Sequence, residues 1–313
     1  MQKQEMVLIF VPAFVLCVLS GCGNQKGLSS AEYGQTVSYE AQSIDLPGVP
    51  NARQLGGYVI NGKTVRKDVL LRTGELGNAS RQAVNTLAEK YHLAYIFDLR
   101  ASVERDHLPD RDVEGSRNIW LPCLEDMLRE LSAKGSKMKL PSIDDPYLLD
   151  SILKEFSENT WLVELSNGMM PAIAADRTIQ KNVAEILDSL VVLPEGKAAL
   201  WHCSRGKDRC GFTSAMVLAA LGADQDLIVK DFALSNHGYQ QKLDSILEVA
   251  EKRGCSEDNR NMIYNVIGVN PGIFSKMLDQ IKKQYGSLDN YLTKALDCPA
   301  SQRRALREKF LVK

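Results

Sequence analysis

Short, continuously apolar runs alternate with longer amphipathic segments along most of the chain. These runs predict strands at residues 68–72 and 95–98, each with an apolar centre, and a buried strand at residues 197–201. Apolar residues spaced three and four positions apart predict an amphipathic helix at residues 176–190. Residues 211–221 are apolar on nearly every side, which predicts a buried helix, and a further helix is expected at 81–90. Gly222 follows the buried helix, as a helix-ending glycine commonly does. Strands alternating with helices predict an α/β fold with a central, mostly parallel sheet flanked by helices.

Two other parts of the chain have a different pattern. The C-terminal third, residues 226–313, is helical in spacing almost throughout. Residues 124–167 are polar and only loosely helical. We interpret this second segment as a helical insertion of the kind that often forms a lid over a functional site.

The chain begins with an apolar run over residues 7–19. As a helix this run would span about 20 Å, short of the ~30 Å hydrocarbon core of a bilayer, so it predicts a signal peptide rather than a membrane-spanning helix. The run ends in Leu-Ser-Gly-Cys22, which resembles the lipobox of bacterial lipoproteins. In that family the signal is cut before the cysteine, and the cysteine carries the lipid. An ordinary secretory signal with an incidental cysteine is the alternative.

This resemblance implies a division of the chain into three parts. Residues 1–21 would be the lipoprotein signal peptide, and Cys22 the lipidated first residue of the mature protein. Residues 22–45 are polar and rich in Gly, Ser and Gln, which predicts a flexible tether. Residues 46–313 would form one folded domain, held outside the cytoplasm on a bacterial membrane or cell surface.

Composition excludes several other classes of protein. The chain has 313 residues, 44% of them hydrophobic and 25% charged, as in folded globular proteins. The formal net charge is −1, whereas nucleic-acid-binding domains are usually basic, so no nucleic-acid partner is expected. Two of seven cysteines lie in the signal segment, and the other five are scattered without a CxxC pair. They predict neither a disulfide framework nor a zinc site.

The segment Trp-His-Cys-Ser-Arg-Gly-Lys-Asp-Arg-Cys-Gly, residues 201–211, carries the candidate chemistry. It connects a predicted buried strand to a predicted helix, a geometry that turns backbone N–H groups toward an anion at the positive end of the helix dipole. Cys203 and Arg209 form a Cys-x5-Arg motif. The N–H groups and the guanidinium stabilise a thiolate, and Arg209 offers a two-pronged donor for phosphoryl oxygens. Together they predict phosphoryl transfer through a cysteinyl-phosphate. A Walker loop is excluded because Asp208 follows Gly206-Lys207.

This segment resembles the HCxxGKDRTG loop of the bacterial tyrosine-specific protein phosphatases, a family that includes secreted enzymes active on phosphoinositides. Further segments match the family in order, at residues 51–57 (NARQLGG), 71–74 (LRTG), 97–100 (FDLR) with Glu104, 230–235 (KDFALS) and 285–292 (YGSLDNYL). The resemblance covers most of residues 44–313. It implies a cysteine-phosphatase-like fold and a catalytic domain over residues 46–313.

The same resemblance assigns roles to residues of the loop. Cys203 is the expected nucleophile, Arg209 the phosphate clamp and Asp208 the general acid. Asp98 is the alternative general acid, although an aspartate at this position could instead form an ion pair with Arg53 or Arg72. Substrate binding is expected at the intervening loop residues, Ser204, Arg205, Gly206 and Lys207, while His202 is expected to be structural. No metal or organic cofactor is implied.

The sequence departs from the family pattern at two positions. Gln54 replaces an acidic residue, so any ion pair there is lost or reduced to a hydrogen bond. Cys210 replaces the usual threonine, and because a thiol is the weaker donor we expect slower turnover than with threonine. Cys210 could instead form a reversible disulfide with Cys203, or simply pack the first helical turn.

Three functions therefore remain open from the sequence. The leading one is hydrolysis of phosphotyrosine, with phosphoserine and phosphothreonine as further protein substrates. The second is hydrolysis of phosphoinositides or inositol phosphates, because Arg205 and Lys207 suit multiply charged headgroups. The third is a catalytically weak phosphate-binding module, which the presence of both Cys203 and Arg209 disfavours. The expected partners are a phosphorylated protein or a phosphoinositide, with the membrane reached through the lipid anchor.

Overall fold

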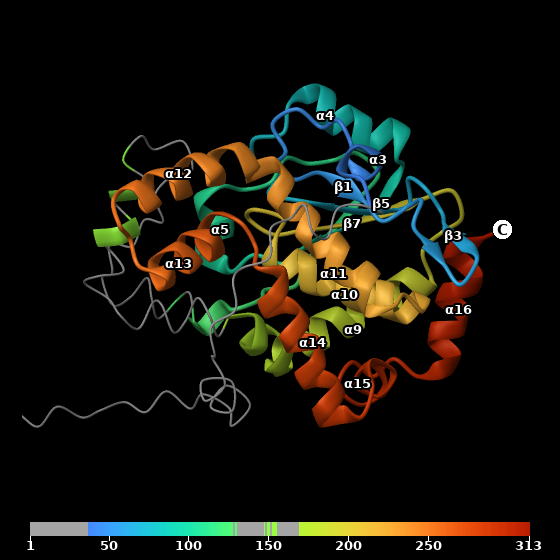
Figure 1. Cartoon of the computed structure of the whole chain (residues 1–313). Helices are drawn as coiled ribbons and strands as arrows, with labels where there is room; N and C mark the ends of the chain where they lie inside the picture. The colour runs from blue at the N-terminus through green and yellow to red at the C-terminus, as the bar shows by residue number, and fades with distance from the viewer. Residues whose placement is uncertain (1–36, 128, 130–146, 148, 151, 155–168) are drawn as a thin grey trace, which may run out of the picture.

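The computed structural model describes residues 37–127, 129, 147, 149–150, 152–154 and 169–313 (Figure 1). The expected signal peptide, Cys22 and much of the expected tether and insertion lie outside the described residues. Within the described part of the chain, no helix has the length and apolar character needed to cross a membrane.

A five-stranded sheet forms the centre of the fold, in the order β1-β4-β7-β5-β6. All neighbouring strands are parallel except β1, which is antiparallel to β4. The strands span Arg53–Gln54 (β1), Leu70–Thr73 (β4), Leu93–Asp98 (β5), Arg117–Trp120 (β6) and Ala198–His202 (β7). The prediction of a mostly parallel α/β sheet is therefore confirmed. The edge strands β1 and β6 were not predicted, because neither has a continuous apolar run.

Helices cover both faces of the sheet (Figure 1). On one face, Ala198 and Leu200 of β7 pack with the cluster under α4 (Arg81–Asn85) and η1 (Thr86–Lys90), a π-helical continuation of it. On the other face, Ala199 and Trp201 join the main core. That core is shared with the helices α9 (Arg177–Val191), α10 (Asp208–Leu221), α11 (Gln225–Ala233) and α14 (Pro271–Tyr285). Since strand side chains alternate in direction, a strand covered on both faces is apolar at every position.

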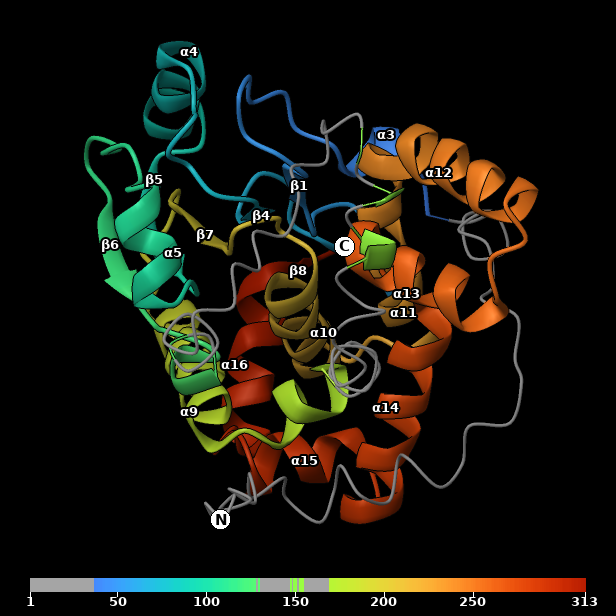
Figure 2. The ribbon, with the colours of Figure 1, turned by 90° about the vertical axis from the view of Figure 1, so that its left-hand side faces the viewer.

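The C-terminal third is helical, as expected, apart from its last residues. Its further elements are η2 (Leu234–Tyr239), α12 (Gln240–Lys252), α13 (Glu257–Ile267), α15 (Leu288–Lys294), α16 (Ala300–Phe310) and β8 (Leu311–Val312). Strand β8 completes a small antiparallel sheet with β2 (Val59–Ile60) and β3 (Lys63–Val65). Helices α12 and α13 pack on each other with an apolar cluster of their own, apart from the main core (Figure 2).

Helix α10 begins earlier than its apolar pattern suggested. It starts at Asp208 rather than at residue 211, so the end of the candidate loop is its first turn. Gly222 ends it in a left-handed conformation with φ 95°, as predicted. Gly211 allows close packing of α11, because a Cβ there would lie 2.5 Å from the ring of Phe232.

The packed part of the chain also begins before residue 46. Val37 is buried in the main core, α3 spans Tyr39–Gln42, and Ser43 forms a β-bridge with Arg53. The flexible tether expected over residues 22–45 is therefore too long at its C-terminal end.

Candidate active site

The candidate loop, residues 203–207, leaves the carboxyl end of central strand β7 and enters α10. Carboxyl ends of parallel strands are the usual place for binding sites in α/β folds. Gly206 has φ 66°, and a Cβ there would lie 2.6 Å from the backbone of Thr73 and Gly74 at the end of β4. Only glycine fits this backbone conformation and this contact. The loop is thereby folded against β4, with the N-terminus of α10 beside it.

Cys203 is buried at the start of this loop, with 3% of its surface exposed. A hydrogen bond from the thiol of Cys210 lowers the pKa of Cys203 most, and the charge of Arg209 and the N–H of Cys210 lower it further. Burial acts in the opposite direction, yet the pKa is lowered to about 5. The thiolate is therefore the resting form at neutral pH, as a nucleophile requires.

Cys210 has a more specific position than the sequence suggested. Its Sγ lies 3.5 Å from the carbonyl oxygen of Thr73, and its pKa is raised well above the usual value by burial and by the neighbouring Cys203. It therefore stays protonated, and its S–H can donate to the Cys203 thiolate or to the carbonyls of Thr73 and Trp201, 3.5 and 3.8 Å away. Both thiols are free in this structure, and a disulfide between them remains a prediction that peptide mapping after mild peroxide would test.

Arg209 is held by a carboxylate from α5 (Ser102–His107). Its two terminal nitrogens lie 2.6 and 2.7 Å from the two oxygens of Glu104, and one also donates to the carbonyl of Leu99 at 3.2 Å. Burial would raise the pKa of Glu104, but the hydrogen bonds and charge of Arg209 outweigh it and lower the pKa to about 2. Glu104 also accepts a hydrogen bond from Ser204. This arrangement leaves the Nε edge of the guanidinium available for an anion.

The two other basic residues of the loop turn toward α13. Lys207 donates to the carbonyls of Asn265 and Gly268 at 3.1 and 2.8 Å, and Arg205 donates to that of Val266 at 2.9 Å. These carbonyls lie at the C-terminal end of α13, the negative end of its dipole. Sequence reasoning assigned both side chains to substrate binding. In this structure they hold α13 against the loop, and their role in substrate binding stays a prediction.

The two candidate general acids have different surroundings. Asp208 is 2.9 Å from Lys207, and 20% of its side chain is exposed. Asp98 is fully buried and bonded through both oxygens to Arg100, each at 2.9 Å. The ion pairs of Asp98 with Arg53 or Arg72 that the sequence suggested are therefore not formed.

Asp98 also belongs to a cluster with Asp110 and His202, whose ligand atoms lie within 4.8 Å of one another. The guanidinium of Arg100 lies among them, 2.9 Å from Asp98 and 2.8 Å from Asp110. The arginine thus supplies the positive charge that a cation would bring to these carboxylates. His202 is fully buried, with Nε2 3.0 Å from Asp110, and its structural role stays a prediction.

Two residues outside the loop were placed only in part by sequence reasoning. Glu104 was recognised within a motif, but its bond to Arg209 was not predicted. Gln54 accepts a hydrogen bond from the backbone N–H of Asp68 at 2.7 Å, so the side chain at this departure does form a hydrogen bond.

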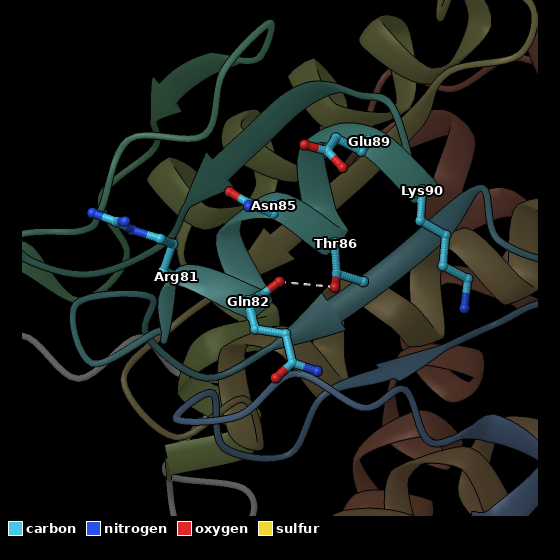
Figure 3. Close-up of a pocket in the computed structure, with 6 residues that line it drawn as sticks. All are labelled: Arg81, Gln82, Asn85, Thr86, Glu89 and Lys90. Carbon is cyan, nitrogen blue, oxygen red and sulfur yellow. Dashed lines mark hydrogen bonds between the residues drawn. The ribbon is translucent and has the colours of Figure 1, made fainter.

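A separate hollow of about 500 Å³ lies on the outer side of α4 and η1 (Figure 3). It is lined by Arg81, Gln82, Asn85, Thr86, Glu89 and Lys90. The hydroxyl of Thr86 donates to the carbonyl of Gln82 at 2.8 Å, as is ordinary within a helix. The hollow includes no residue of the loop around Cys203 and brings together no nucleophile and base.

A thiolate of low pKa beside a fixed arginine, between a buried strand and a helix N-terminus, defines a cysteine-dependent phosphatase. Comparison with known proteins agrees. A model of the tyrosine phosphatase family matches residues 44–312, so the chain belongs to that family. It is 28% identical over 260 residues to a provisionally named tyrosine-protein phosphatase of Cupriavidus necator, covering 82% of this chain and 85% of that one. It is 34% identical over 114 residues to the triple specificity protein phosphatase PtpB of Mycobacterium tuberculosis, covering 34% of this chain and 41% of that one. The protein is therefore a protein-tyrosine phosphatase that hydrolyses phosphotyrosine.

Alkylation of Cys203 by iodoacetamide is expected to follow its thiolate, with a midpoint near pH 5. Replacing Cys210 by alanine removes the donor that lowers this pKa most, so the midpoint should rise. Cys210→Thr keeps a donor, so its midpoint should stay closer to that of the original protein. The rate is measured against pH by mass spectrometry of the Cys203 peptide. An unchanged midpoint in Cys210→Ala would show that the thiol does not stabilise the thiolate.

Proposed function

We propose that hydrolysis proceeds by attack of the Cys203 thiolate on phosphorus, with Arg209 and the loop N–H groups binding the phosphoryl oxygens. The P–O bond to the tyrosine breaks as the S–P bond forms, and Asp208 protonates the departing phenolate oxygen. Water then attacks the cysteinyl-phosphate and releases phosphate, while the thiolate leaves. The observation that carries this proposal is the buried Cys203, whose thiolate is stabilised beside Arg209.

The second step gives Cys210 a role. As the thiolate leaves phosphorus, its developing charge accepts the hydrogen bond that Cys210 offers at rest. A thiol donates more weakly than a hydroxyl. This is the basis for the expected slower turnover relative to threonine at this position.

Asp208 is favoured over Asp98 as the general acid because its carboxylate is accessible and because it follows Cys203 by five positions in the sequence. Asp98 is buried and bonded twice to Arg100, so both of its oxygens are already used. Asp208 is partly exposed, so a leaving group can approach its carboxylate from solvent.

Replacing Asp208 by asparagine is expected to lower kcat for a phosphotyrosine peptide about 100-fold, because an amide cannot protonate the leaving oxygen. The loss should be much smaller for 4-nitrophenyl phosphate, whose less basic leaving group needs little protonation. Steady-state kinetics on both substrates measures the difference, with Asp226→Asn, an exposed side chain on α11, as the matched control. Equal losses on the two substrates would assign the proton transfer to another residue.

Phosphotyrosine in a protein is the substrate that we place first, with phosphoserine and phosphothreonine next. Phosphoinositides are the second candidate, because Arg205, Lys207 and Arg209 gather positive charge around the loop. Two of these cations bond to α13, and a multiply phosphorylated headgroup would have to displace those bonds. Phosphate release from a phosphotyrosine peptide and a phosphoinositide panel separates the two, and binding without turnover would instead favour the phosphate-binding module.

We further propose that the enzyme is a lipoprotein anchored through Cys22 on the outer side of a bacterial membrane. The proposal rests on the apolar run at residues 7–19 and the Leu-Ser-Gly-Cys that follows it. Mass spectrometry of the mature N-terminal peptide tests it. A peptide that does not begin with a lipidated Cys22 would contradict the anchor.

A further inference from the structure

Within the candidate loop, the carbonyl groups of residues 204–207 each accept a hydrogen bond that directs them outward. That of Ser204 accepts from the N–H of Glu75 at 3.2 Å, and that of Lys207 from the N–H of Gly211 at 2.8 Å. The carbonyl of Gly206 accepts from two side chains, Asn51 at 2.8 Å and Arg72 at 2.9 Å.

Weaker contacts complete the set. The carbonyl of Arg205 lies 3.5 Å from Nδ2 of Asn51 and 3.4 Å from the hydroxyl of Tyr239. Arg72 also approaches the carbonyl of Lys207 at 3.3 Å. Asn51 and Arg72 are thus the two side chains that each contact two consecutive carbonyls of the loop.

A held carbonyl fixes the direction of the next N–H, because the peptide unit is planar and trans and its C=O and N–H point in opposite directions. With the carbonyls of residues 204–207 directed outward, the N–H groups of residues 205–208 face the inside of the loop. Among the residues that the structure describes, the N–H groups of Arg205, Gly206 and Lys207 donate to no backbone or side-chain acceptor. Such a set of inward N–H groups binds an anion.

The guanidinium of Arg72 is itself held in place by a carboxylate. Its other terminal nitrogen donates to Asp231 at 2.8 Å, and Asp231 also accepts from the hydroxyl of Tyr58 at 2.8 Å. Arg53 lies 3.6 Å from the same carboxylate, and both arginines are fully buried. Two buried guanidinium groups share this one carboxylate, which leaves an excess of positive charge directly behind the loop. That charge favours an anion on the loop's inner side.

We infer that Arg72 and Asn51 are positioning residues of the phosphatase: by holding the carbonyl groups of the loop outward they direct its N–H groups toward the phosphate. Asp231 in turn holds Arg72. The inference rests on the proposed use of this loop as the phosphate site. It gives a function to the motifs at residues 51–57, 71–74 and 230–235, which the roles of Cys203, Arg209 and Asp208 leave unexplained.

The test measures inhibition by orthovanadate and by inorganic phosphate, which need the loop N–H groups but no leaving-group proton. Arg72→Lys keeps the charge but offers a single nitrogen, which cannot reach both Asp231 and the carbonyl of Gly206. Asn51→Asp keeps the shape and suits the local φ of 51°, but replaces the donor with an acceptor that repels the carbonyl. In each variant we expect the inhibition constants to rise about ten-fold, which is about 1.4 kcal/mol, with kcat/KM for phosphotyrosine falling in parallel.

The matched control is Ser214→Ala. It removes a buried hydrogen bond of 3.0 Å that the indole N–H of Trp201 in β7 donates to Ser214 in α10, and Ser214 contacts no loop carbonyl. This variant should lower the thermal midpoint while leaving both inhibition constants unchanged. Unchanged constants in folded Arg72→Lys and Asn51→Asp would overturn the inference, and Asn51→Asp decides alone if Arg72→Lys does not fold. If the original protein is itself not inhibited by either anion, the proposed phosphate site has failed instead.

Discussion

Replacing Cys203 by serine is expected to lower kcat for a phosphotyrosine peptide by at least about 10³-fold. The resting nucleophile is a thiolate with a pKa of about 5, whereas the serine hydroxyl has no base among the proposed roles to remove its proton. Phosphate release under reducing conditions measures the loss. Binding of phosphate or vanadate should persist, because Arg209 and the loop N–H groups are unchanged.

The control for this substitution is Cys255→Ser, the same chemical change between α12 and α13. It should retain the activity of the original protein. A Cys203→Ser variant within ten-fold of the original would place the nucleophile elsewhere.

Replacing Glu104 by glutamine is expected to lower kcat about 100-fold, the scale of effect produced by misplacing a catalytic group by about 1 Å. Glutamine keeps the size of the side chain, but its amide NH₂ would face the guanidinium of Arg209 and one of the two charged hydrogen bonds would be lost. The measurement is kcat and KM for a phosphotyrosine peptide, together with inhibition by vanadate. Both should worsen, because Arg209 contacts the phosphoryl oxygens in the proposed mechanism.

Glu125→Gln is the matched control, since Glu125 accepts from the N–H of Ser102 at 2.7 Å at the start of the same helix and does not contact the loop. If Glu104→Gln kept full activity, Arg209 would not depend on its carboxylate partner.

The pKa of Glu104 also bears on the pH dependence. In the folded protein it is lowered to about 2 from an ordinary value of 4.5. A carboxylate whose pKa is lowered by folding stabilises the folded protein at pH values above its pKa in the unfolded state. That stabilisation is lost as the pH falls through its pKa in the folded state. The pair with Arg209 therefore persists to well below pH 4. The decline of thiolate reactivity near pH 5 is then due to protonation of Cys203, not to release of Arg209.

Much of the fold could be predicted because its signals are local. The strand at residues 197–201 and the helices at 176–190 and 211–221 are apolar in patterns that only a buried strand or an amphipathic or buried helix produces. The short strands β1, β2, β3, β6 and β8 could not be predicted. They are two to four residues long, and β1, β6 and β8 form only where a partner elsewhere in the chain supplies the hydrogen bonds, as β3 does for β8. Strands β2 and β3 pair with each other across Asn61-Gly62, a local turn signal that the sequence analysis did not use.

The loop was predicted for the same reason: its nucleophile, its arginine and its glycine lie within seven consecutive residues, 203–209. Gly206 and Gly211 are required by backbone conformation and by close packing, and both stand within that local motif or beside it. The sequence by itself determined the family chemistry, because the groups that react are contributed by one turn between a strand and a helix.

Only the tertiary structure decided which residues fix that chemistry in place. The partner of Arg209 is 105 positions away, and the donors to the carbonyl of Gly206 come from 134 and 155 positions away. It also brought Lys207, an expected substrate contact, to the carbonyl of Gly268 just after α13, 61 positions further on. A long cationic side chain takes whichever acceptors packing brings within about 3 Å, and that choice is made by the assembled core, not by neighbours in the chain.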